Sequence, residues 1–389
     1  MTKQSHILLI ISSLIMMLLM GTVYAYSVFR LHIENQYQVG TLLSGLPYMT
    51  SLFFYALSMM MTGRFLKSRY LRRFAFYGTL LIALGWLMSS LASSIWMLTF
   101  SYGLLIGIGV GMVYGIPIFM VQKLFPKRSG LMTGIILLGF GMSPLITAPL
   151  ASALIFATSL KTSFLIFGLA FLVIQLPLTY VFIMKEYQDF KKTTDEPFVH
   201  EKLTPFKRIY VLFVIATTIG LMMIGLSYQV GVVYYQFGPR EVTLSLSFFA
   251  LMNGVARPLF GMLMDKKGFK FSVLTSLSLI GLASIIGLVN RGQFLSLYIL
   301  SFGLFWFNLG AWLSIVPATI KAFYGIKYYA RKYGIMFTAY GFGSIIGTLI
   351  SGTIMDALGL TTYIYIAIMI LIGTSLWIVT QIKMPAIRR

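Results

Sequence analysis

The chain has 389 residues, of which 58% are hydrophobic and only 10% are charged, and its formal net charge is +21. A soluble protein of this length usually carries about 25% charged residues, so the composition excludes an ordinary soluble protein and indicates a polytopic protein of the lipid bilayer. The positive charge does not require a nucleic-acid partner, because Lys and Arg collect on the cytoplasmic side of membrane proteins. We therefore expect no binding of nucleic acid.

The residue types that bind metals are scarce. The chain has no cysteine, which excludes disulfides and thiolate metal sites. The three histidines, His6, His32 and His200, lie near the N-terminus or in predicted loops, so no buried histidine cluster is available. We expect no metal, no cofactor and no enzymatic activity.

The N-terminal segment has the features of a signal peptide, since Lys3 and His6 precede an apolar run and Val23-Tyr24-Ala25 could serve as a cleavage site. The apolar run, however, continues to Phe29. A bilayer core of roughly 30 Å requires about 20 apolar residues, so the run is long enough to span it. We interpret this segment as an uncleaved first membrane-spanning helix.

Long apolar runs separated by short polar segments predict twelve membrane-spanning helices. Strands are not expected, because the runs are continuous rather than alternating in hydropathy. The predicted spans are 7–30, 41–63, 74–93, 95–122, 129–157, 162–184, 209–236, 242–264, 270–290, 293–324, 332–356 and 361–382.

Positively charged residues are distributed unequally between the two sets of loops. If the N-terminus lies inside, 25 of the 30 Lys and Arg residues fall in cytoplasmic segments. Only Arg30, Lys161, Arg240 and Arg291 fall on the outer side. This bias predicts a multi-pass protein of the plasma membrane with both termini in the cytoplasm.

Residues 185–208 form the one long polar segment. We interpret this segment as a cytoplasmic linker between six-helix halves at residues 1–184 and 209–389. Matching residues at offsets of 198 to 202 support a duplication, namely Gly63 and Gly261, Gly103 and Gly303, Pro117 and Pro317, and Gly139-Phe-Gly141 and Gly341-Phe-Gly343. Two such halves around a central substrate are typical of secondary transporters, and we expect a monomer. A sensor or scaffold that signals through 185–208 is an alternative.

Arg257 is the one charged residue that the predicted spans place well inside the membrane. A lone cation there costs roughly 2.5–3.5 kcal/mol on insertion scales, which makes it a functional candidate. One interpretation is that the side chain snorkels to the inner interface. The interpretation that we favour is that its planar guanidinium pairs with the carboxylate of a transported anion, in space opened by Pro258.

The nine acidic residues all lie near predicted helix ends or in loops, so none is expected to neutralise Arg257. This absence also argues against a proton relay built on a membrane carboxylate. Asn253, one helical turn before Arg257, is expected to orient the guanidinium. Tyr24, Tyr114 and Tyr340, near mid-depth in their spans, are expected to donate hydrogen bonds to the substrate.

The segment that follows Arg257 resembles the loop signature of the major facilitator superfamily. The matching residues are Gly261-x-x-x-Asp265-Lys266-x-Gly268-x-Lys270. The resemblance implies an all-α fold of twelve transmembrane helices in two pseudo-symmetric halves. It also implies a conformational, gating role for these residues and for Arg128, which precedes the fifth span. The first-half copy of the loop has Lys67 where Asp is expected.

Four further segments resemble the oxalate/formate antiporter family and the related monocarboxylate transporters. They are Tyr24-Ala-Tyr26-Ser-Val-Phe29, the signature formed by residues 107–117 and 125–134, Asn253-Gly-Val-Ala-Arg257-Pro258-x-x-Gly261, and Ala330-Arg331-Lys332-Tyr333-Gly334. The resemblance implies that Arg257 binds the substrate carboxylate and that Tyr24 and Tyr114 line the pocket.

The chain also departs from these families at informative positions. Tyr340 stands where the dicarboxylate-handling member has a lysine, and Leu309 and Leu313 stand where aromatic residues are expected. Asn253 stands where proton-coupled carriers have an aspartate. A single cation in a more apolar pocket is expected to favour a monoanion over oxalate, without proton coupling through that side chain.

We therefore predict a secondary transporter that moves a small monocarboxylate such as lactate, pyruvate or formate by alternating access. An efflux transporter of apolar or amphiphilic compounds, which would use the Met- and Phe-rich interior, is the alternative. The two differ at Arg257, because the efflux alternative predicts that replacing this residue by alanine leaves transport intact.

Overall fold

The computed structural model describes residues 3–63, 71–125, 129–179, 205–359 and 361–382, and all regular structure in these segments is helical. Eleven helices in the described segments are long and apolar enough to cross a membrane. One of them, α12 (Pro239–Asn290), has 52 residues and would be about 80 Å long if it were straight. Its backbone reverses at Gly268, where φ is +78°, so α12 makes two of the twelve predicted passes.

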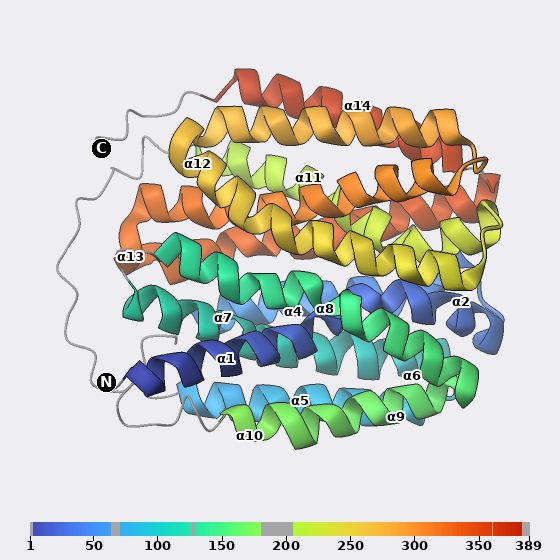
Figure 1. The fold of residues 1–389 in the computed structure, drawn as a ribbon, viewed down its shortest axis with the longest axis horizontal. Helices are drawn as coiled ribbons and strands as arrows, with labels where there is room; N and C mark the ends of the chain where they lie inside the picture. Colours follow the sequence, from blue (N-terminus) through green and yellow to red (C-terminus); the bar gives the residue numbers. More distant parts are fainter. Residues whose placement is uncertain (1–2, 64–70, 126–128, 180–204, 360, 383–389) are drawn as a thin grey trace.

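Helices α1 to α10 form the lower part of the molecule in Figure 1. Short 3-10 and π segments interrupt three of the passes without ending them. The elements are α1 (Lys3–Met20), η1 (Gly21–Ala25), α2 (Tyr26–Tyr37), α3 (Thr41–Ser44), α4 (Leu46–Gly63), α5 (Leu71–Ser90), α6 (Ile95–Leu98), η2 (Thr99–Ile106), α7 (Gly107–Leu124), α8 (Ser129–Ala157), α9 (Leu160–Ala170), η4 (Phe171–Gln175) and α10 (Leu176–Leu178).

The remaining helices form the upper part of the molecule in Figure 1. They are α11 (Phe206–Gln229), η8 (Val230–Tyr234), α12, α13 (Leu295–Leu358) and α14 (Thr361–Thr380). Like α12, α13 is two passes, because its backbone reverses at Gly325, where φ is +60°. Both chain ends lie at the left-hand end in Figure 1, which is also where α12 reverses.

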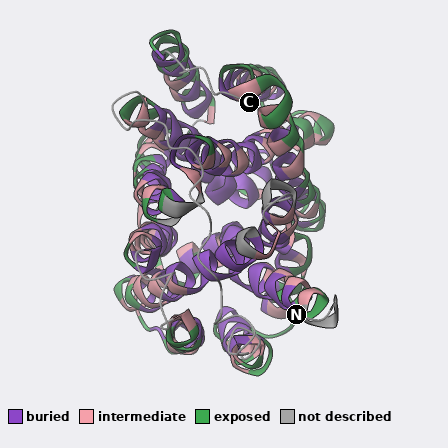
Figure 2. Ribbon diagram, turned by 90° about the vertical axis from the view of Figure 1, so that its left-hand side faces the viewer, coloured by how far each residue is buried: buried purple, intermediate pink, exposed green. Residues whose placement is uncertain are grey.

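The two groups of helices meet along extended helix pairs. In the contacts between them, α8 packs on α12, α4 packs on α13 and α2 packs on α11. Figure 2 shows the buried residues gathered where the helices face one another and the exposed residues turned outward.

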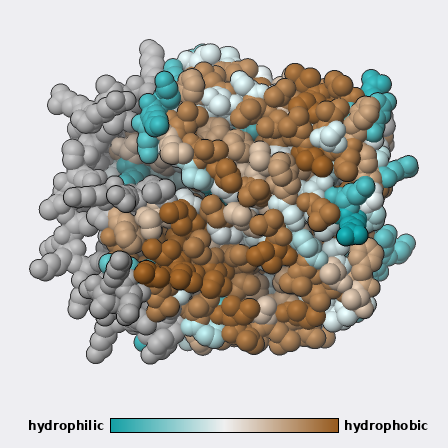
Figure 3. Space-filling model, viewed as in Figure 1, coloured by the Kyte–Doolittle hydropathy of each residue, from teal (hydrophilic) through white to brown (hydrophobic). Residues whose placement is uncertain are grey.

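The outer surface of the helices is apolar. Large hydrophobic side chains such as Phe156, Val173 and Trp377 are at least 66% exposed. Figure 3 shows apolar residues over the middle of the visible face and polar residues toward its right-hand end. An apolar surface of this extent in contact with water would be unfavourable, whereas hydrocarbon accommodates it. The chain is therefore a multi-pass membrane protein.

The first span is longer than predicted. The sequence places its end at residue 30, but α1, η1 and α2 continue the pass to Tyr37. Consequently Arg30 and Glu34, expected near a helix end, lie inside the helix, and Arg30 is 2% exposed. A prediction from hydropathy ends a span at its first charged residues. It ends this span too early, because Arg30 and Glu34 have hydrogen-bond partners inside the protein and can therefore lie within the helix.

Several predicted features lie outside the described residues. These are Arg128, Lys67 and most of the linker predicted at 185–208, of which the structure describes only 205–208. The division of the chain into 1–184, 185–208 and 209–389 therefore stays a prediction at the level of its boundaries.

Candidate functional site

Arg257 lies in the first pass of α12, and this helix continues through Pro258. Its side chain is fully buried, at 0% exposure. The guanidinium is directed at α8, so it does not face lipid. The snorkelling interpretation is therefore wrong, because it requires the side chain to reach toward the end of its own helix. The burial of so large a charged side chain is uncommon in proteins and calls for specific partners.

The partners of Arg257 are neutral. Nη1 donates to the backbone carbonyl of Leu137 in α8 at 2.5 Å, and Nη2 donates to Oδ1 of Asn253 at 3.1 Å. Asn253 is held in turn, because its Nδ2 donates to the backbone carbonyl of Trp306 at 2.7 Å. The amide of Asn253 therefore presents its oxygen to the guanidinium and its nitrogen to α13.

No acidic residue neutralises Arg257 in the part of the chain that the structure describes. None of its carboxylates lies within salt-bridge distance of the guanidinium, and Nε is buried without a hydrogen-bond partner. A buried cation with one unsatisfied donor is electrostatically incomplete. An anion is the ligand that would complete it.

A cavity of about 120 Å³ reaches Arg257. Its walls come from both halves, with Thr133 and Leu137 from α8 and Pro258 and Gly261 from α12. Asp265 and Lys321, which lie near the reversals of α12 and α13, also line the cavity. The space is large enough for several water molecules or one small anion.

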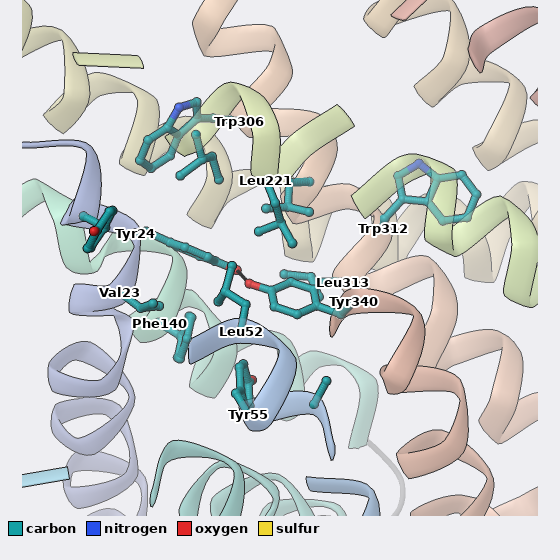
Figure 4. Close-up of a cluster of buried hydrophobic side chains, with 14 of the residues drawn as sticks. Val23, Tyr24, Leu52, Tyr55, Phe140, Leu221, Trp306, Trp312, Leu313 and Tyr340 are labelled. Atoms are coloured by element: carbon teal, nitrogen blue, oxygen red, sulfur yellow. Dashed lines mark hydrogen bonds between the residues drawn. The ribbon is translucent and has the colours of Figure 1, made fainter. Parts of the chain in front are cut away.

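Tyr24 and Tyr340 contact each other across the two halves. Their hydroxyls lie 2.7 Å apart, and either can be the donor. Figure 4 shows this bond between the first pass and α13, with Leu52, Leu221 and Leu313 around it. Neither tyrosine lines the cavity next to Arg257. Because their hydrogen bond joins the two halves, the pair closes the centre of the molecule in this conformation.

Tyr114 belongs to an aromatic cluster that also contacts Tyr24, through Phe140. Its ring packs edge-on against Tyr55 and Phe140, with centroids 5.1 and 5.3 Å away, and lies 5.9 Å from Phe337. Arg257 is close enough to Tyr24 and Tyr114 to act on both hydroxyls electrostatically. The fold thus brings Asn253, Tyr24 and Tyr114 to one cation, and Tyr340 is hydrogen-bonded to Tyr24 beside it.

The predicted gating loop lies at the end of the molecule that carries the termini. Gly268 has the positive φ that reverses the chain, while Asp265, Lys266 and Lys270 are exposed. Gly261 and Asp265 also line the cavity below Arg257. The loop is therefore placed where it meets whatever enters or leaves the cavity.

A second polar cluster joins the halves at the opposite end of the molecule. We call Arg30, Glu34, Thr41, Gln229 and Asp356 the outer cluster. Within the N-terminal half, Arg30 Nη2 donates to the Thr41 carbonyl, and Arg30 Nε lies 3.8 Å from a Glu34 carboxylate oxygen.

Most of the bonds of the outer cluster cross between the halves. Arg30 Nη1 donates to the Gly225 carbonyl at 3.0 Å, and Gln229 Nε2 lies 3.1 Å from both Glu34 carboxylate oxygens. The Asp356 carboxylate accepts from the backbone N–H groups of Thr41 and Leu42 at 2.8 and 2.9 Å. This end of the molecule is therefore closed by charge-assisted hydrogen bonds.

Sequence reasoning missed the outer cluster. The available signal was the spacing of Arg30 and Glu34, which places opposite charges four residues apart on one helix face. No local pattern indicates Gln229 or Asp356 as their partners, because these residues come from other passes.

Comparison with known proteins places the chain in a family. The sequence pattern described as "Major Facilitator Superfamily" matches residues 9–235 and again residues 210–386. The chain belongs to the major facilitator superfamily. The all-α fold with its two groups of helices agrees with this assignment, and a member of this superfamily is a transporter and not an enzyme.

The superfamily relatives include carriers of small carboxylates. The oxalate:formate antiporter of Oxalobacter formigenes is 26% identical over 296 residues, which cover 74% of this chain and 69% of that protein. An uncharacterised MFS-type transporter of Escherichia coli K12, YhjX, is 23% identical over 365 residues, covering 88% and 87%. Monocarboxylate transporter 9 of Gallus gallus is 35% identical, but over only 97 residues, which cover 25% of this chain and 19% of that one.

A solved structure supports the fold over nearly the whole chain. The crystal structure of a POT family transporter in complex with a thioalcohol-conjugated peptide superposes with a TM-score of 0.77. The alignment covers 97% of this chain and 96% of that transporter at 14% identity. At this identity the likeness concerns the superfamily fold alone.

Proposed function

We propose that this member of the superfamily is a secondary transporter that moves a small monocarboxylate anion of the lactate, pyruvate and formate class across the plasma membrane. It works by alternating access, with both termini in the cytoplasm. Substrate is held between the halves and is exposed to one side of the membrane at a time.

One observation carries the proposal. Arg257 is buried between the halves, has no acidic partner in the described residues, keeps an unsatisfied Nε and lines a cavity. A guanidinium offers a planar fork that matches a carboxylate, and the pair is strong where water is excluded. The substrate would thus supply the negative charge that the described chain does not place beside Arg257.

The relatives support the same substrate class. Two of the names among them, oxalate:formate antiporter and monocarboxylate transporter, refer to small carboxylates. The environment of Arg257 favours a single negative charge, because Asn253, Tyr24 and Tyr114, the polar side chains that act on it, are uncharged and provide no second cation. We therefore propose a monoanion rather than oxalate.

The arrangement suits one conformation of an alternating-access cycle. The outer cluster closes one end, the Tyr24–Tyr340 bond closes the centre, and the cavity extends from Arg257 toward the other end. In the conformation that binds substrate, Tyr24, Tyr114 and Tyr340 donate to the carboxylate and Asn253 orients the guanidinium. Residues of the Gly261–Lys270 loop and Arg128 govern the change between conformations.

Uptake by purified protein in lipid vesicles tests the proposal. Radiolabelled lactate, pyruvate and formate are offered to the wild type and to Arg257→Ala, with oxalate as competitor. We expect the uptake rate of the variant to be about 10-fold to 100-fold lower than that of the wild type, because a charge-assisted bond contributes about 1.5–3 kcal/mol. Oxalate should compete more weakly than the monocarboxylates.

Arg240→Ala is the matched control, since Arg240 lies on the same helix but is exposed at the end of the molecule away from the cavity. Its uptake should equal that of the wild type. Unchanged monocarboxylate uptake by Arg257→Ala, or efflux of apolar compounds by both proteins, would favour the alternative of an efflux transporter for apolar or amphiphilic compounds.

A further inference from the structure

Arg257 belongs to the C-terminal half, but its guanidinium ends on the N-terminal half. Nη1 donates to the carbonyl of Leu137 in α8, a residue 120 positions earlier in the chain. Nη2 stays within α12, bonded to Asn253. The cation that we propose to bind substrate is therefore also a direct contact between the halves.

Gly141, one helical turn after Leu137, provides the space for this contact. A Cβ at position 141 would lie 2.7 Å from Asn253 Oδ1, 3.0 Å from Arg257 Nε and 3.1 Å from Arg257 Cζ. Non-bonded heavy atoms attract best at about 3.5–4.0 Å, so all three distances are too short. The guanidinium thus occupies the volume that an alanine methyl group would take.

The atoms that such a methyl group would displace are the ends of flexible side chains. This differs from other close glycines of the first pass and α8, such as Gly21, where a Cβ would collide with the backbone oxygen of Phe140. A conflict with backbone forces helices apart, whereas a conflict with a guanidinium is relieved by moving the guanidinium. Alanine at 141 should therefore disturb the cation more than the fold.

We propose that Gly141 is a positioning residue for Arg257 and thereby a determinant of anion affinity, an inference that rests on the proposed function. Leu137 and Arg257 both line the cavity, so a carboxylate that arrives there meets the guanidinium at the Leu137 carbonyl. The carboxylate replaces this carbonyl as the acceptor at Nη1, because a negative charge attracts the guanidinium more strongly than a neutral carbonyl does and a carboxylate matches its planar fork. Binding of the anion then releases one contact between the halves.

Gly141→Ala is tested in reconstituted vesicles with radiolabelled lactate, pyruvate and formate over a range of concentrations. We expect KM to rise about 10-fold or more while kcat changes by less than about twofold, because the variant misplaces the binding group without altering the helices that move. The matched control is Gly254→Ala, at the same helix pair. Its Cβ would meet the flexible side chain of Met142 and not Arg257, so its KM should stay within about twofold of wild type.

Arg257→Lys separates positioning from helix packing. A lysine has no planar fork to occupy the space beside residue 141, so Gly141→Ala should raise KM less in the Arg257→Lys background than in the wild type, while its contact with Asn253 Oδ1 is the same in both. The comparison of the double variant with Arg257→Lys remains measurable even if Gly141→Ala alone folds poorly. An unchanged KM in Gly141→Ala overturns the inference. So does an equal rise in KM when Gly141→Ala is introduced into the wild type and into Arg257→Lys. Full uptake by Arg257→Lys and Arg257→Ala would instead overturn the proposed function.

Discussion

At the scale of single residues, the central contact is one hydrogen bond shared by two hydroxyls. Tyr24 and Tyr340 are each 1% exposed, and their oxygens lie 2.7 Å apart. Removing one hydroxyl leaves the other buried without this partner, which costs about 1–3 kcal/mol. Removing both leaves no unsatisfied group at this contact, so the loss should be smaller than the sum of the two single losses.

We expect Tyr24→Phe and Tyr340→Phe each to lower the unfolding temperature in detergent, and the double variant to lower it by less than their sum. Uptake should behave differently, because both hydroxyls are proposed donors to the substrate. The double variant should therefore have the highest KM of the three. Strictly additive losses in unfolding temperature would contradict a shared bond, and a normal KM in the double variant would contradict the substrate role.

At the scale of helices, the side chain of Gln229 in α11 contributes several of the hydrogen bonds that hold the outer end closed. Gln229 donates to both carboxylate oxygens of Glu34 and to Thr41 Oγ1, so it joins α11 to α2 and α3. Hydrogen bonds to a charged acceptor contribute about 1.5–3 kcal/mol each. Leucine is similar in size but cannot donate, so Gln229→Leu should shift the population toward conformations that are open at this end.

The expected shift is measured by thiol labelling, since the chain has no native cysteine. A cysteine at Leu52, which lies beside the Tyr24–Tyr340 bond in Figure 4, reports access from outside to a membrane-impermeant reagent. Gln229→Leu should raise the labelling rate about 10-fold. Gln175→Leu is the control, because buried Gln175 donates to Thr79 within one half. Equal rates in the two variants would show that Gln229 does not hold this end closed.

At the scale of the whole molecule, transport requires the two halves to separate at the outer end. Leu42 of α3 and Gly352 of α13 face each other there, and a Cβ at 352 would lie 2.9 Å from Leu42 Cβ. Cysteines bonded in a disulfide have Cβ atoms about 3.5–4.5 Å apart, so a small adjustment is enough to link them.

We expect Leu42→Cys combined with Gly352→Cys to lose monocarboxylate uptake on oxidation and to recover it on reduction, because the link holds the outer end closed. Each single cysteine variant serves as the control and should be insensitive to the oxidant. Full uptake by a completely cross-linked double variant would exclude alternating access through this end.

The sequence by itself determined the class of the protein and the identity of its central cation. Hydropathy and charge are properties of short segments, so the apolar runs predict the passes and isolate Arg257 within one of them. Helical periodicity also predicts its nearest side-chain partner, since Asn253 lies one turn away and does bond to it. The loop motif around Gly268 predicts the reversal of the chain for the same local reason.

Only the tertiary structure decided which polar groups meet. Tyr24 and Tyr340 are 316 positions apart, and Glu34 and Gln229 are 195 apart, so their contacts depend on how whole helices pack. The same packing brings the Leu137 carbonyl and the bare backbone of Gly141 to Arg257. It also buries Arg30 and partly buries Glu34, which a hydropathy reading places at or beyond the end of the first span, because bonds from the opposite half help to make their burial tolerable.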